Sequence, residues 1–237
     1  KLENDAKLLK DYLSLVDELM ATLDDPYYAK KLLGKAENLL NNEPFNIDNY
    51  EKLILSIKKH LNDSQWILNL INFILQNRVK FIFDYINLIN LALHHISDET
   101  ISKRTALDIL KKAETVIDNS QNKLAYDYFK LAKIAYEKLN SSDLALELLN
   151  KAEKCELNPY TLANIGGLEL KLDKPEKAQI NFDKAISNCK SSTDIINLIT
   201  FLKTINDDND LLVNLYLKGK NIIKQFDEKL IWAEGFV

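Results

Sequence analysis

ALELLNKA at residues 145–152 and AQINFDKA at residues 178–185 decide how this chain folds. Both octets have alanine at the first and last positions and a large apolar residue at the fifth. ALDILKKA at 106–113 and AKKLLGKA at 29–36 share this pattern. Spacings of four and three put these three residues on one face of an α-helix. The two small side chains let a neighbouring helix approach closely, while the large one fills the groove between the helices.

The pattern recurs along the chain. Two further segments keep the spacing with other residue sizes, Trp66/Leu70/Phe73 and Leu212/Tyr216/Gly219, so the triplets begin at residues 29, 66, 106, 145, 178 and 212. Before each triplet lies a polar linker rich in Asp, Asn or Ser, residues that cap helix N-termini. Before each linker, an amphipathic segment ends in Leu or Ile. We expect helical hairpins over about 3–42, 46–77, 79–117, 120–156, 159–189 and 191–226.

The composition agrees with an all-α fold. The chain has only five glycines and four prolines among 237 residues, which leaves few turn residues for a β-sheet protein. We expect a single repeat domain over 1–237, an α-solenoid of about six antiparallel helix-turn-helix repeats. The tail 227–237, with Trp232 and Phe236, is expected to cap the last repeat or to begin a further helix. The most apolar stretch, 79–96, contains Lys80 and Asp84 and reads as a buried helix, not a membrane span.

Residues 160–188 resemble a tetratricopeptide repeat (TPR). The residues that carry the resemblance are Leu162, Ile165, Gly166, Leu172, Asp173, Ala178, Phe182 and Ala185. The preceding unit, 129–159, is similar but has Lys133 in place of the glycine, and the first three units are similar only to TPR-like hairpins in general. The resemblance implies a right-handed superhelix whose first helices line a concave groove, and it implies binding of a partner protein or peptide.

The same resemblance gives candidate groove residues. They are Asp127, Lys130, Ile134, Glu137, Tyr160, Ala163, Asn164, Gly167 and Lys171. The alternative is an ordinary solvated helix face. Some members of the family clamp a peptide carboxylate with Lys and Asn side chains, and Lys130 and Asn164 match two of those places. Ile134 stands where that clamp needs an Asn, so we do not predict the clamp.

No pattern in the sequence indicates catalysis, a cofactor or a metal site. The three histidines fall at the ends of expected first helices, where capping and surface roles suit them. The two cysteines, Cys155 and Cys189, form no ligand motif and indicate a reducing, cytoplasmic compartment. Carboxylates are numerous, but no pair is placed as acid and base. We therefore expect no catalytic residue and no enzyme.

The expected function is a non-enzymatic scaffold that binds a partner protein or peptide on its concave repeat surface. The first alternative is a structural or regulatory repeat segment of a larger multidomain protein. The second is a helical-repeat RNA binder, against which the net charge of −4 weighs, because phosphate-binding surfaces are normally basic. The sequence names neither the partner, the biological process nor the oligomeric state, and a leader or anchor before Lys1 stays open.

Overall fold

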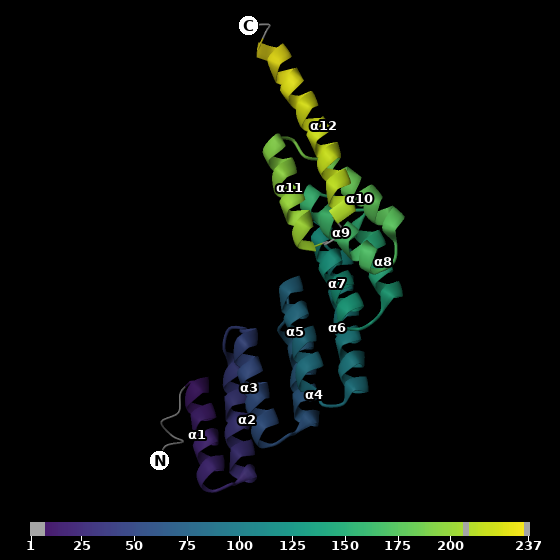
Figure 1. Ribbon diagram of the computed structural model, residues 1–237. Coiled ribbons are helices and arrows are strands. Elements are labelled where there is room, and N and C mark those ends of the chain that lie inside the picture. Colours follow the sequence, from purple (N-terminus) through teal and green to yellow (C-terminus); the bar gives the residue numbers. More distant parts are fainter. Residues whose placement is uncertain (1–7, 206–208, 235–237) are drawn as a thin grey trace. The chain divides into compact units, whose positions relative to one another are not determined.

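The computed structural model describes residues 8–205 and 209–234, and within these ranges the chain forms twelve α-helices and no strand (Figure 1). The helices fall into two compact units, 1–116 and 117–237. All secondary structure in these ranges is helical, so the all-α prediction is confirmed. That all six expected hairpins stack as one domain stays a prediction.

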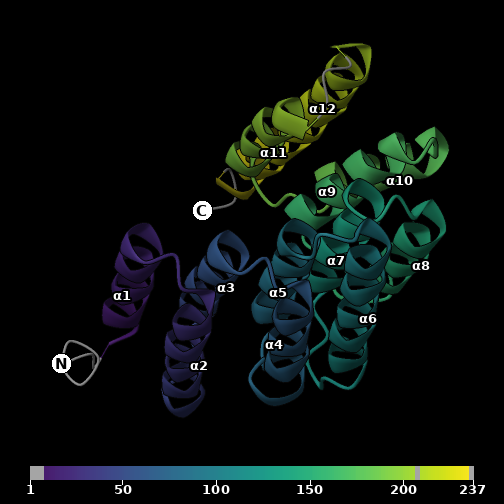
Figure 2. The same ribbon diagram turned by 90° about the horizontal axis from the view of Figure 1, so that it is seen from below.

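The first unit holds three hairpins and contains almost all of α6. Its helices are α1 (Leu9–Thr22), α2 (Pro26–Asn42), α3 (Ile47–His60), α4 (Ser64–Asn77), α5 (Ile82–His95) and α6 (Glu99–Asp118), whose last two residues belong to the second unit. The first helices contact one another in series, α1 against α3 and α3 against α5 (Figure 2). α6 has 20 residues and begins seven residues before its triplet, which accounts for the long interval between the triplets that begin at residues 66 and 106.

The second unit holds the other three hairpins. Its helices are α7 (Ala125–Glu137), α8 (Ser142–Ala152), α9 (Pro159–Lys171), α10 (Pro175–Ser187), α11 (Ser192–Ile205) and α12 (Asn209–Glu234). Here too the first helices follow one another, with α7 against α9 and α9 against α11. α12 runs on through residues 227–234, where the sequence suggested a cap or a further helix. Phe236 and the side chain of Trp232 lie outside the described residues.

The three residues of each triplet lie at the interfaces between helices. All twelve residues of the four regular triplets are buried, as their spacing predicts, and eleven of them are completely inaccessible: Ala29, Leu33, Ala36, Ala106, Leu110, Ala113, Ala145, Ala152, Ala178, Phe182 and Ala185. Gly166 provides the matching close approach, because a Cβ there would lie 2.7 Å from Cε1 of Phe182. The sixth triplet is different: Tyr216 is 53 % exposed, and Leu215 is the buried residue instead.

The turn inside four of the hairpins has a repeated backbone conformation. Asp24, Asn62, Asn140 and Asp173 each have a positive φ, between 47° and 57°, two or three residues after the end of the first helix of hairpins 1, 2, 4 and 5. Asp and Asn tolerate this left-handed conformation better than other residues with a side chain. The second helices of hairpins 1, 2 and 3 begin at side-chain caps. The carboxylates of Asp25, Asp63 and Asp98 accept hydrogen bonds of 2.9–3.0 Å from the backbone N–H three residues later.

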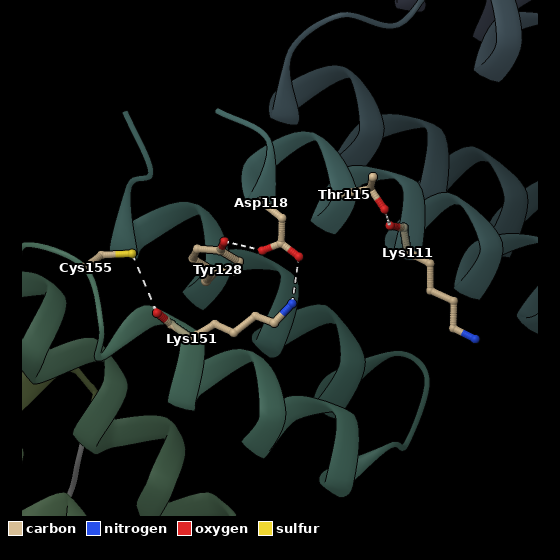
Figure 3. A network of polar contacts seen from close by, with 6 residues as sticks. All are labelled: Lys111, Thr115, Asp118, Tyr128, Lys151 and Cys155. Carbon is tan, nitrogen blue, oxygen red and sulfur yellow. Dashed lines mark hydrogen bonds and ion pairs between the residues drawn. The ribbon is translucent and has the colours of Figure 1, made fainter. Parts of the chain in front are cut away.

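Polar side chains join neighbouring hairpins at one repeat's distance along the chain. The Nζ of Lys30 lies 3.0 Å from Oδ2 of Asp63, and that of Lys218 lies 2.6 Å from Oδ1 of Asp183. Figure 3 shows a third link, in which Lys151 donates to Oδ2 of Asp118 at 2.8 Å. The side chain of Lys151 is half-buried, and this bond joins its hairpin to the preceding one.

Candidate functional site

An aromatic pocket lies on the first-helix side of the second unit. It has a volume of about 560 Å³, and its apolar wall comes from Leu124, Tyr126, Tyr160 and Phe201. Tyr160 and Phe201 meet edge to face, with their ring centroids 5.4 Å apart. Tyr126 stacks on Phe129 at 5.8 Å. Each tyrosine ring therefore packs against another aromatic ring, which restricts its rotation.

A smaller, charged groove adjoins this aromatic pocket. Its volume is about 210 Å³, and Lys133, Glu137, Lys171 and Thr204 line it with polar atoms. Glu137 lies between two lysines, with carboxylate oxygens 3.5 Å from Nζ of Lys171 and 4.0 Å from that of Lys133. Both lysines are 53 % exposed, so a ligand can compete for them at little cost.

Asn164 belongs to the walls of both cavities and so joins them. Its side-chain amide donates to the carbonyl of Tyr160 at 2.9 Å, which leaves its oxygen as an acceptor at the boundary. The position of Tyr160 follows from the start of α9. Asn158 accepts a hydrogen bond of 2.8 Å from the N–H of Thr161, and Pro159 occupies the first turn. These two residues fix the first turn and hence the direction of Tyr160.

The structure brings five of the nine predicted groove residues into these cavities. They are Glu137, Tyr160, Asn164, Gly167 and Lys171. Gly167 contributes mainly by packing, because a Cβ there would lie 3.1 Å from Cδ1 of Ile205. Ala163 is inaccessible and Ile134 is 8 % exposed, so both belong to the core and offer a partner no side-chain surface.

The remaining two predicted residues lie beside the aromatic pocket. The Nζ of Lys130 sits 4.6 Å from the ring centroid of Tyr126 and covers one face of this wall. Asp127 is half-buried, and burial raises the pKa of its carboxyl, an effect that Lys130 partly opposes. A cation therefore lies against one ring of the pocket wall, beside a lining that also contains the polar residues Glu156, Asn158 and Thr161.

Sequence reasoning missed several lining residues. Tyr126 could have been found, because Tyr126 and Tyr160 both occupy the second position of their helices, 34 residues apart, like a repeated groove position. Phe201 gives no such signal, because it lies in the middle of α11, whose hairpin has a weaker repeat pattern. Lys133 was noted only as a substitute for a glycine.

The histidines and cysteines do not form a further centre. Cys189 is buried and Cys155 half-buried, and both are free thiols. His60 contacts Asp17 at 2.7 Å, whereas His95 is buried and not at the surface as expected. Over residues 8–205 and 209–234, no three His, Cys, Asp or Glu side chains are grouped to hold a metal ion. No helix in these ranges has the length and apolar character needed to cross a bilayer.

Comparison with known proteins gives one solved structure to report. No protein-family model matches the chain, and no curated protein matches it. Among solved structures, the chain is similar to a thermophilic TPR protein of Thermus thermophilus. The two are 19 % identical, the match covers 83 % of this chain and 98 % of that one, and the TM-score is 0.42.

Proposed function

We propose that this protein is a non-enzymatic interaction module whose second unit binds a peptide segment of a partner protein. The observation that carries the proposal is the junction of the aromatic pocket and the charged groove at Asn164. The two cavities lie on successive first helices and together offer an apolar site next to a polar one. Most sites for peptides combine these two elements, an apolar anchor and polar groups that fix its orientation.

The chemistry of the walls indicates what kind of segment would fit. Tyr126, Tyr160 and Phe201 suit a large apolar or aromatic side chain as the anchor. Beside it, Lys133 and Lys171 can pair with a carboxylate of the partner, and Glu137 can pair with a cation. The bound segment therefore has a bulky apolar residue followed or preceded by charged residues.

The test begins with a phage-displayed library of random peptides selected on the purified chain. Selected peptides are synthesised, and their affinities are measured by isothermal titration calorimetry. Tyr126→Ala and Lys171→Glu should each weaken binding about tenfold or more, which corresponds to about 1.4 kcal/mol. Tyr126 is 44 % exposed and Lys171 is 53 % exposed, so neither side chain belongs to the buried core.

Matched controls come from α10, which lines neither cavity. Ile180→Ala and Lys184→Glu alter an exposed apolar residue and an exposed lysine on that helix. Both controls should bind the selected peptides like the original protein. If the peptides bind Tyr126→Ala and Lys171→Glu undiminished, or lose binding to the α10 variants instead, the function does not reside on this face.

A further inference from the structure

The first unit has a cavity of its own, between α3 and α5, with a volume of about 470 Å³. One wall is a continuous stripe of α5 with helical spacing, formed by Phe83, Asn87, Asn90, Leu91 and His94. The other wall is the first turns of α3, with Ile47, Asp48 and Glu51. The cavity shares no residue with the site in the second unit, so a ligand bound here is independent of the function proposed there.

The cavity carries net negative charge. Asp48 and Glu51 both line it, whereas no lysine or arginine does. The carboxylate of Asp48 makes no ion pair among the residues that the structure describes, and its side chain is exposed. Glu51 is 47 % exposed, and its one ion-pair partner among the described residues is His95, whose Nε2 lies 3.8 Å from Oε1. Two carboxylates therefore face the same cavity with little compensation.

The neighbouring cationic groups do not neutralise this charge. Lys58 is turned to the end of α5, where its Nζ donates to the carbonyl of His94 at 3.0 Å. Both ring nitrogens of His95 are buried without a hydrogen-bond partner. Burial first, and then the charge of Lys58, lower the pKa of His95, so its ring is neutral near pH 7 and leaves Glu51 uncompensated.

An exposed aromatic ring completes the arrangement. Phe83 is 63 % exposed although it lies at the cavity, an unfavourable place for a phenyl ring in the free protein. Asn87 adds an amide, whose oxygen is a hydrogen-bond acceptor, one turn further along α5. A ring face, two carboxylates and an amide match a guanidinium group, which stacks on aromatic rings and has five N–H donors.

We propose that the α3–α5 cavity binds an arginine side chain of a partner peptide. Its guanidinium group lies against Phe83 and donates to the carboxylates of Asp48 and Glu51. Charge complementarity defines this occupant: the cavity is acidic and lined by no lysine or arginine, and an arginine supplies both the missing charge and a flat group for the ring. The ammonium group of a lysine has the charge but cannot stack in the same way.

The probe is a fluorescein-labelled, amidated peptide of sequence Gly-Ser-Arg-Gly-Arg-Ser-Gly, with binding to the full chain measured by fluorescence anisotropy at low salt. Two further peptides replace both arginines by citrulline, which is neutral and of similar shape, or by lysine. We expect saturable binding of the arginine peptide, at least tenfold weaker binding of the citrulline peptide, and several-fold weaker binding of the lysine peptide. Equal binding of the arginine peptide and either replacement peptide would overturn the proposal, as would no saturable binding.

Protein variants locate the site. The double variant Asp48→Asn/Glu51→Gln should lose at least tenfold in affinity, and Phe83→Ala should lose several-fold. The matched controls are Glu18→Gln/Asp108→Asn, which makes the same change in net charge at exposed positions, and Phe81→Ala, which removes an exposed ring next to the cavity. Losses of equal size in the controls would show general charge attraction and overturn the proposal. Tyr126→Ala, in the second unit, should leave the arginine peptide unaffected, which keeps this test separate from the one above.

Discussion

Replacing glycine by alanine is expected to have opposite effects on stability at two positions of this chain. At Gly166 in α9, an added Cβ would lie 2.7 Å from Cε1 of Phe182 and 3.0 Å from two further ring atoms. Phe182 is completely buried, so the ring has no space into which it can turn. At Gly34 in α2, no atom outside the adjoining residues and the local helix backbone lies within 4 Å of the added Cβ. Gly166→Ala and Gly34→Ala therefore differ in packing and not in the chemistry of the change.

The magnitudes follow from two opposed effects. Alanine in place of a glycine inside a helix stabilises the protein by about 1 kcal/mol. Overpacking a filled core by one methyl group costs about 1–3 kcal/mol, and the fixed position of Phe182 places this case in the upper part of that range. We expect Gly34→Ala to raise the free energy of unfolding by about 1 kcal/mol and Gly166→Ala to lower it by roughly 1–2 kcal/mol.

The assay is urea unfolding followed by far-ultraviolet circular dichroism, with hydrogen exchange to assign the change to α9 and α10, because repeat proteins need not unfold in one step. A double variant tests the cause. In a Phe182→Leu background the ring is absent, so Gly166→Ala should no longer destabilise the protein. If Gly166→Ala stabilises the original chain as much as Gly34→Ala does, the close crossing of α9 and α10 is wrong.

Two further predictions concern ionisable groups. Lys151 and then the Tyr128 hydroxyl, as hydrogen-bond donors, lower the pKa of Asp118 below its usual 3.8 (Figure 3). The folded state therefore gains stability from this carboxylate above that pH and loses it as the pH falls, so Asp118→Asn should cost about 0.5–1 kcal/mol at pH 7 and progressively less toward pH 3 in urea unfolding. Burial raises the pKa of Glu169, which is 1 % exposed and accepts a hydrogen bond of 2.8 Å from Asn181. The folded state therefore becomes more stable as the pH falls toward 5. Glu169→Gln should raise the free energy of unfolding by roughly 1 kcal/mol at pH 7 and remove this pH dependence, which thermal unfolding between pH 5 and pH 7 measures. A variant with the same pH profile as the original protein would contradict the prediction.

The hairpins could be predicted from sequence because their signals are local. The spacing of a triplet such as Ala145/Leu149/Ala152 identifies the buried face of its helix, and the Asp and Asn residues between helices indicate the turns. Where the repeat weakens, the prediction weakens as well. In the last hairpin the spacing selected Tyr216, although Leu215 is the buried residue, because most positions of α12 near it are apolar and no alanine fixes the register.

The candidate site was harder to predict than the fold. Exposed groove positions such as Glu137 and Lys171 follow from helical spacing, but Ile134 and Ala163 share that spacing and are buried. Which of these first-helix residues are buried depends on how closely the first helix of the next hairpin packs against them. A single sequence does not give the distance between the two helices. Phe201 reaches the aromatic pocket only through the packing of α11 on α9, and the α3–α5 cavity likewise arises from packing.

The side-chain links between hairpins also bear on how the chain assembles during synthesis. Lys30 pairs with a residue 33 positions later, and Tyr136 donates to the carbonyl of Lys171, 35 positions later. A hairpin leaving the ribosome thus obtains its stabilising neighbour after about two to seven more seconds of translation, at typical rates of about 5–20 residues per second. Its apolar face is exposed to chaperones and to aggregation only for that interval, and the first unit can be complete before the second has been made.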